Sequence, residues 1–217
     1  AASDVYKRQE QDRSGLDYIF SWHGNTDLII GIIKLVEDKM NADEDILEGG
    51  VQAILLVEDS IRFYSTYLPE LYKLLLLQNT EFLKDAFNEQ QQVLRKRARP
   101  KILLARCYEE AVELYERYKK NLLGVISDVD DTIMVTQAPR LMKAAYNLLL
   151  LNPRKKVPVA SMNLLFNRIA DMFPDAPFFY LSTSPWNVES SIRHFITNHG
   201  FPEGPLLLRD LSLIHIS

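Results

Sequence analysis

The 217-residue chain has 47% hydrophobic and 25% charged residues, an ordinary composition for a folded globular protein. Its 25 Lys and Arg residues stand against 29 Asp and Glu residues, so no global basic surface favours nucleic acid. A single cysteine, Cys107, excludes an internal disulfide and fits a reducing, cytoplasmic setting. The longest apolar runs are far shorter than the roughly 18 residues that a membrane span needs. We therefore expect no transmembrane segment.

The two ends of the chain are related at the DNA level. A back-translation of Asp4 to Gln9 has a reverse complement that encodes Leu211 to Ile216. This string resembles the transposon-end adapter used in fragment-library sequencing. We interpret residues 1–9 and 211–217 as translated adapter, exclude them from fold reasoning and expect the natural protein to extend past both ends. Native terminal extensions are the alternative.

The first 130 residues alternate apolar runs with segments of helical periodicity. Leu28, Ile32 and Val36 recur at helical spacing, and Pro69 is expected to interrupt a later helix. The predicted order is a strand at 17–22, a helix from Thr26 or Asp27 to Met40, a turn or linker at 41–50, a strand at 51–57, a helix from 61 to about 92, a strand at 102–105, a helix at 108–120 and a strand at 122–127. This alternation predicts βαβ units and a parallel sheet.

A basic run occupies residues 95–101. We interpret it as a solvated face, with phosphate or nucleic-acid contact as the alternative. The triplet Val36 to Asp38 is repeated at Val57 to Asp59, but its first copy lies inside a predicted helix. We treat that repeat as coincidence.

Three carboxylates follow predicted strands. Glu58 and Asp59 follow the strand at 51–57, and Asp128 follows the strand at 122–127. Parallel sheets carry their chemistry beyond the carboxyl ends of the strands, and clustered oxygen ligands suit Mg²⁺. The pattern indicates a magnesium site, with helix caps as the alternative interpretation.

Residues 50–128 resemble a response-regulator receiver domain, and the stretch from Asp17 looks like receiver regions attached to bacterial phosphoenolpyruvate-synthase-like proteins. The resemblance implies that Glu58 and Asp59 bind Mg²⁺ together with Asp128, that Asp128 accepts a phosphoryl group, and that a histidine kinase is the partner. A receiver should continue with two further strands carrying Ser or Thr and then Lys. Neither can be placed after Asp128.

A second pattern begins at the same aspartate. Asp128, Asp130 and Thr132 form an Asp-x-Asp-x-Thr motif behind an apolar strand. The motif resembles the haloacid-dehalogenase-like phosphatases. Its spacing lets the first carboxylate attack phosphorus while the second protonates the leaving oxygen and later deprotonates water.

A second motif indicates which type of phosphatase the chain resembles. Residues 177–182 form an apolar strand ending in Ser182, followed by Ser184, Pro185, Trp186 and Asn187, a helix at 188–198 and a segment to Asp210. Residues 125–210 are similar to the catalytic domain of actin-patch-type phosphatidate phosphatases. The resemblance implies a phosphoester substrate, phosphatidate lipid among the candidates, with Ser182 on the phosphoryl group and Ser184, Trp186 and Asn187 near the substrate. It also implies Mg²⁺ held by Asp128 and by the carbonyl of Asp130. Packing of Trp186 against the sheet is the alternative.

Part of that family's pattern is missing. A Lys and a third acidic motif should follow Asp210, but Lys143, Lys155 and Lys156 all precede the second motif. We expect an incomplete site and negligible turnover.

The two resemblances overlap at residues 125–129. We predict an α/β, Rossmann-like parallel sheet with flanking helices, a hybrid of two partial α/β domains: a receiver-like region at 10–129 and a phosphatase-like region at 125–210. An assembly chimera explains this better than a gene fusion, because no linker is present. Both halves need the strand at 122–127, which has only two edges. The expected outcomes are a hybrid sheet with 51–57 on one side and 178–181 on the other, or one ordered half. Beside the phosphatase and the receiver, the third functional possibility is a chain without stable function.

Overall fold

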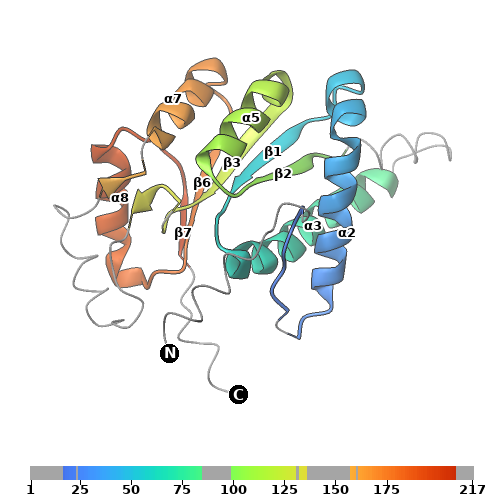
Figure 1. The fold of residues 1–217 in the computed structure, drawn as a ribbon, viewed down its shortest axis with the longest axis horizontal. Coiled ribbons are helices and arrows are strands. Elements are labelled where there is room, and N and C mark those ends of the chain that lie inside the picture. Colours follow the sequence, from blue (N-terminus) through green and yellow to red (C-terminus); the bar gives the residue numbers. More distant parts are fainter. Residues whose placement is uncertain are drawn as a thin grey trace.

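A computed structural model describes residues 17–22, 24–84, 99–130, 132–135, 157–159 and 161–208 (Figure 1). Five strands in this part of the chain form one parallel sheet in the order β2-β1-β3-β6-β7. They are β1 (Ala53–Val57), β2 (Lys101–Ala105), β3 (Leu122–Asp128), β6 (Phe178–Ser182) and β7 (Leu206–Leu208). A separate antiparallel pair joins β4 (Met134–Val135) to β5 (Val157–Pro158). The expected α/β fold with a parallel sheet is confirmed.

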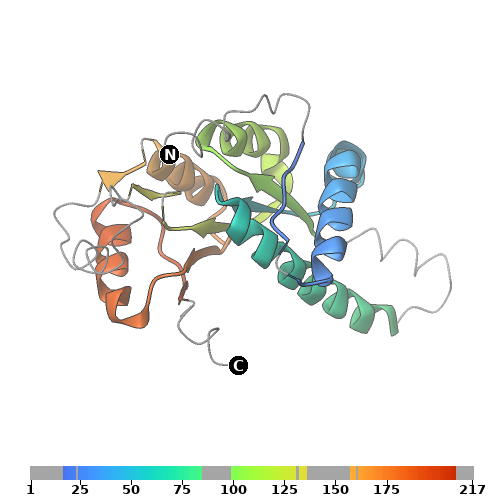
Figure 2. The same cartoon turned by 60° about the horizontal axis from the view of Figure 1, so that its bottom comes forward.

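Helices cover both faces of the sheet. They are α2 (Asp27–Ala42), α3 (Ile61–Lys84), α5 (Tyr108–Tyr118), α7 (Met162–Met172) and α8 (Glu189–Asn198). Figure 2 shows α5 and α7 on one side of the sheet and α3 on the other. The apolar core is divided in the same way, since Tyr115 and Phe166 belong to one buried cluster and Tyr64 and Tyr72 to another. Strands buried on both faces explain why their sequences are continuous apolar runs.

Strand β3 is shared by the two halves of the chain. Val125 is in register with Leu55 of β1 on one edge and with Phe178 of β6 on the other. The structure therefore contains the hybrid sheet, in which both edges of β3 are used. Gly124 allows the close approach on the β6 side, because a Cβ there would lie 2.8 Å from the carbonyl oxygen of Pro177.

The predicted strand at 17–22 is wrong. These residues form no strand, because their backbone groups bond to side chains of α3 instead of to a neighbouring strand. The Ser21 N–H donates to Ser65 Oγ at 2.9 Å, and the Tyr64 hydroxyl donates to the Ile19 carbonyl.

Two predicted interruptions of helical structure, the turn at 41–50 and the break at Pro69, are also wrong. The turn expected at 41–50 is helical instead: α2 runs to Ala42 and continues as a π-helical stretch, Asp43–Glu48, before Gly50 turns the chain with φ of 67°. The break expected at Pro69 does not occur. Its ring packs against Gly31 of α2, where an added Cβ would lie 3.2 Å from the ring, so tertiary packing outweighs the lost hydrogen bond. Residues 85–92 of that predicted helix lie outside the described residues.

The prediction that the basic run at 95–101 forms a solvated face is wrong for residues 99–101, the part of the run that the structure describes. Arg99 and Lys101 are buried, because both reach the carboxylate of Asp38 on α2. Arg99 Nη2 donates to Asp38 Oδ1 at 2.6 Å, and Lys101 Nζ pairs with Asp45 at 2.6 Å. Residues 95–98 lie outside the described part. The Asp38 of the repeated triplet is thus the anchor of a buried ion-pair network.

The remaining predicted elements agree with the structure to within a few residues, namely α2, β1, β2, α5, β3, β6 and α8. A 3₁₀ turn, Lys119–Asn121, ends the α5 region. None of the helices described has the length and apolar character to cross a membrane.

Candidate active site

The parallel register brings the predicted site residues to one edge of the sheet. Val57 is paired with Ser127, so Glu58 lies beside Asp128 on the next strand. On the other side Asp128 is paired with Leu181, the residue before Ser182. Neighbouring strands are roughly 4.8 Å apart, so the three strand tips lie within reach of one another.

The two central carboxylates are buried without sufficient partners. Glu58 and Asp128 have no exposed surface. Glu58 Oε1 accepts the Ser60 N–H at 2.9 Å, whereas Glu58 Oε2 and both carboxylate oxygens of Asp128 have no hydrogen-bond partner among the described residues. An unpartnered buried carboxylate is costly, and such groups in native structures point to an ion or a reactive role.

Burial and mutual repulsion shift both acids in the same direction. Burial raises the pKa of Asp128 well above its usual range, and the nearby charges of Glu58, Asp130 and Asp59 raise it further, against a smaller lowering by the nearby Asp130 N–H. Burial also raises the pKa of Glu58 to about 8, against a lowering by the Ser60 N–H. The environment therefore disfavours two free carboxylates at neutral pH, and a bound cation would reverse that preference.

The phosphatase-type residues form a hydrogen-bonded group around Asp130. The Ser182 hydroxyl donates to Asp130 Oδ2 at 2.7 Å and the Ser184 hydroxyl donates to the same oxygen at 3.4 Å. The Ser184 N–H in turn donates to Ser182 Oγ at 3.1 Å. Ser182 and Ser184 are buried, so these bonds hold the Asp130 carboxylate beside the strand tips.

One contact joins the receiver-type and phosphatase-type residues directly. The Thr132 hydroxyl donates to Asp59 Oδ1 at 3.3 Å. Two motifs that are 73 positions apart in the sequence thus share one loop cluster. Sequence reasoning named both residues but placed them in rival sites. Only the neighbouring positions of β1 and β3 could have indicated their contact.

Trp186 and Asn187 lie in a short 3₁₀ turn, Trp186–Val188, just after this group. Asn187 is exposed, and 60% of Trp186 is exposed. This exposure disfavours the alternative that Trp186 only packs against the sheet. Its contact with a substrate stays a prediction.

The site has the chemistry of a divalent-cation site without the finished geometry. Its donors are carboxylate oxygens, the ligands that Mg²⁺ prefers, and three of them are unpartnered. Among the described residues, however, no three Asp, Glu, His or Cys side chains already converge as a metal site. The carboxylates would have to turn toward a cation as it binds.

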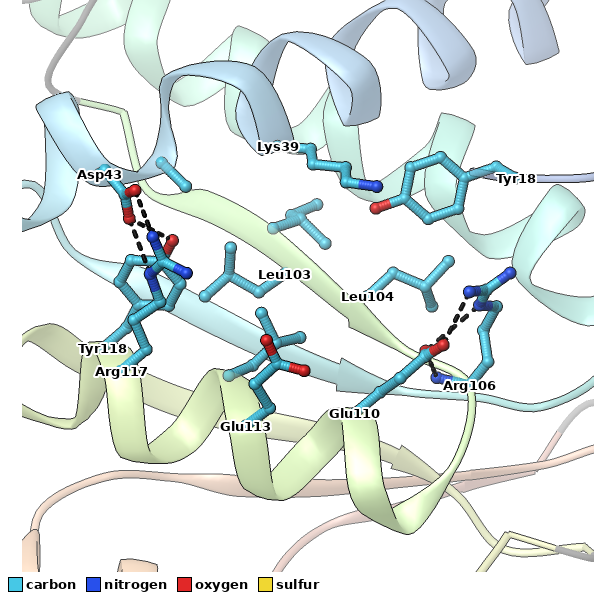
Figure 3. Close-up of a pocket in the computed structure, with 13 residues that line it drawn as sticks. Tyr18, Lys39, Asp43, Leu103, Leu104, Arg106, Glu110, Glu113, Arg117 and Tyr118 are labelled. Atoms are coloured by element: carbon cyan, nitrogen blue, oxygen red, sulfur yellow. Dashed lines mark hydrogen bonds and ion pairs between the residues drawn. The ribbon is translucent and has the colours of Figure 1, made fainter. Parts of the chain in front are cut away.

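A hollow that the sequence did not predict runs along β2 between α2 and α5, apart from the strand-tip site. It has a volume of about 340 Å³ and a floor that includes Leu103 and Leu104 (Figure 3). Arg106 pairs with Glu110 at 2.6 Å at one end, and Arg117 pairs with Asp43 at the other. Lys39, which also lines the hollow, pairs with Asp17. All three cations of the lining therefore have partners, so we assign the hollow no ligand.

Comparison with family models gives a match for the C-terminal part of the chain. Residues 123–217 match the catalytic domain of phosphatidate phosphatase APP1. The match includes Asp128, Asp130, Thr132 and Ser182 and leaves out Glu58 and Asp59. It covers less than half of the chain. Comparisons with curated proteins and with solved structures found no match. The C-terminal region is therefore phosphatidate phosphatase-like.

Proposed function

We propose that this chain carries a Mg²⁺-dependent phosphoryl-transfer site of the phosphatidate phosphatase type, with Asp128 as the residue that accepts the phosphoryl group. The observation that carries the proposal is the position of Asp128. It is the last residue of the central strand, fully buried, and both of its carboxylate oxygens are unpartnered beside Glu58. The family match at residues 123–217 supports a phosphoester or lipid substrate.

Asp128, the carbonyl of Asp130 and Glu58 would hold the cation. Glu58 Oε2 has no hydrogen-bond partner among the described residues, so β1 supplies an acidic group on the side of Asp128 opposite Ser182. In the receiver-type alternative, Asp59 joins Glu58 and Asp128 as a ligand. When bound, the cation screens the carboxylates and the phosphoryl oxygens from one another.

The phosphatase mechanism also needs the Lys and the third acidic motif that could not be placed after Asp210, so we expect this chain to turn over negligibly. In a completed site, Asp128 attacks phosphorus and the bond from phosphorus to the leaving oxygen breaks. Asp130 gives its proton to that oxygen and later removes a proton from the water that hydrolyses the aspartyl phosphate. Ser182 would leave its hydrogen bond with Asp130 Oδ2 to donate to the phosphoryl group. Thr132, through its bond to Asp59, fixes the loop that carries Asp130.

A signalling receiver is the second candidate, favoured by the acidic pair from β1 beside Asp128. A histidine kinase would then be the phosphoryl donor, and Asp130 would have no part in the chemistry. Asp130→Asn distinguishes the two: it should trap phosphorylated Asp128 in the phosphatase and leave the lifetime of the phosphoryl group unchanged in the receiver.

We also propose that the chain joins two sources at β3. The receiver-like region at 10–129 supplies β1 and β2, the phosphatase-like region at 125–210 supplies β6 and β7, and the ends are adapter-derived. Single DNA molecules that span the Asp128 codon unbroken would favour a natural fusion instead.

Beryllofluoride, a mimic of the phosphoryl group, tests the role of Asp128. Fluorine NMR of the chain with Mg²⁺ should show one bound beryllofluoride, and Asp128→Asn should abolish the signal. Asp171→Asn, an exposed acid on α7, is the matched control and should bind normally. Binding retained by Asp128→Asn, or absent from the unmodified chain, contradicts the proposal.

A further inference from the structure

Helix α2 is apolar on two opposite sides. One side buries Leu28, Leu35 and Ala42 against α3 and β2. The other side exposes a stripe, here called the α2 stripe, formed by Ile29, Ile30, Ile33, Val36 and Met40. Their exposed fractions are 51, 40, 57, 39 and 79%. A helix that is apolar all round is normally buried all round.

The spacing of the α2 stripe is that of a helix-pairing seam. Ile29, Ile33, Val36 and Met40 follow one another at intervals of four, three and four residues, the a/d pattern of helices that pack side by side. Figures 1 and 2 show α2 at an outer edge of the molecule, beside β2. Two strands separate it from the end of β3 that carries Asp128. A partner on α2 would therefore leave the candidate active site open.

We propose that the α2 stripe is the interface of a homodimer in which two copies of α2 pack antiparallel. At about 200 Å² for a fully exposed large apolar residue, the stripe offers roughly 500 Å² per chain. The two copies together then reach about 1,000 Å², the lower limit for a specific interface. An interface at this lower limit belongs to the weak, transient class.

Charge decides between a second copy and a lipid surface. Helix α2 and its π-helical continuation carry Lys34 and Lys39 against seven acidic residues, namely Asp27, Glu37, Asp38, Asp43, Glu44, Asp45 and Glu48. Five of these acids are paired, Asp27 with Lys73, Glu37 with Lys34, Asp38 with Arg99, Asp43 with Arg117 and Asp45 with Lys101. Helices that lie on anionic membranes are rich in Lys and Arg, whereas both lysines of α2 are paired and offer an anionic surface no unpaired cation.

Charge also selects the antiparallel direction. Asp43 and Asp45 of the π-helical stretch are paired with Arg117 and Lys101, but Glu44 and Glu48 form no ion pair among the described residues. Parallel helices would bring these two acids of each copy together. An antiparallel pair keeps them apart and sets Ile33 against Val36 of the partner subunit. Both lysines already have partners within the chain, Lys34 on Glu37 and Lys39 on Asp17, so no free cation opposes the contact.

Sedimentation velocity of the full chain over about 1–100 μM tests the dimer. The unmodified chain should shift from monomer to dimer across this range, and Ile33→Glu should weaken association at least 100-fold. Met40→Glu is the second variant, because Met40 is 79% exposed and contributes least to its own fold. Leu164→Glu on α7, with 66% of Leu164 exposed, is the matched control and should dimerise like the unmodified chain.

Each other outcome overturns the proposal. A chain that stays monomeric at 100 μM lacks the interface, and a dimer that persists in both α2 variants uses another surface. Binding to phosphatidylcholine–phosphatidate vesicles that is lost in Ile33→Glu would assign the stripe to lipid. Cooperative thermal unfolding and the far-UV circular dichroism spectrum should be the same in all variants, which shows that they are folded whether or not the proposed active site binds a phosphoryl mimic.

Discussion

Replacing Glu58 by Gln should make the cation-free protein more stable, and only at high pH. The pKa of the buried Glu58 is about 8, against 4.5 for an unperturbed glutamate. Because folding raises the pKa of Glu58, its protonated form contributes fully to the free energy of unfolding below pH 4.5. This contribution falls as the pH rises from 4.5 and is lost once the pH passes about 8. Between pH 5 and pH 8 the loss is on the order of 3 kcal/mol. Gln cannot ionise, and its amide can donate to the unpartnered oxygens of Asp128.

Thermal unfolding in a chelating buffer measures this difference. For a chain of this size, 3 kcal/mol corresponds to a rise in Tm of about 6–12 °C. Glu58→Gln should exceed the unmodified chain by that amount at pH 8 and by little at pH 5. Adding Mg²⁺ at pH 8 should stabilise the unmodified chain more than the variant, because the variant has lost one carboxylate of the cation site.

A Tm difference between Glu58→Gln and the unmodified chain that is equal at the two pH values would contradict this prediction. So would a Glu58→Gln variant that is less stable than the unmodified chain at pH 8. Either result would mean that Glu58 is ionised and satisfied in the folded chain. Asp171→Asn removes an exposed acid from α7 and controls for the change in net charge. Its Tm should follow that of the unmodified chain at both pH values.

Two further substitutions test the packing. Asp38→Ala should cost about 3–5 kcal/mol in urea unfolding because it takes the closest carboxylate from the buried Arg99, while Lys101 keeps its pair with Asp45. Asp43→Ala breaks an exposed pair with Arg117 and should cost at most about 1 kcal/mol. Equal costs would show that the Asp38 network is hydrated. Gly204→Ala should lower Tm far more than Gly200→Ala, because a Cβ on Gly204 would lie 2.1 Å from the Phe178 carbonyl oxygen, while Gly200 has φ of 66° and open space. Similar Tm values for the two would place the segment before β7 away from β6.

Local sequence patterns determined most of the elements and the edge of the sheet where the candidate site lies. Short apolar runs ending in Glu58, Asp128 and Ser182 predicted strands whose carboxyl ends meet, and the described structure has them there. Patterns failed where a distant partner decided the outcome. Pro69 stays inside a helix because Gly31 accommodates its ring, and Arg99 is buried because Asp38 lies opposite it.

Only the tertiary structure decided which neighbours β3 would have. In our interpretation of the sequence, two sets of strands each call for β3 as a neighbour. A parallel strand has two hydrogen-bonding edges, and burying apolar residues on both sides gives the larger core. The sheet therefore takes β1 on one edge and β6 on the other. That pairing, which no local pattern encodes, places Glu58 beside Asp128 and leaves both acids buried at neighbouring strand tips.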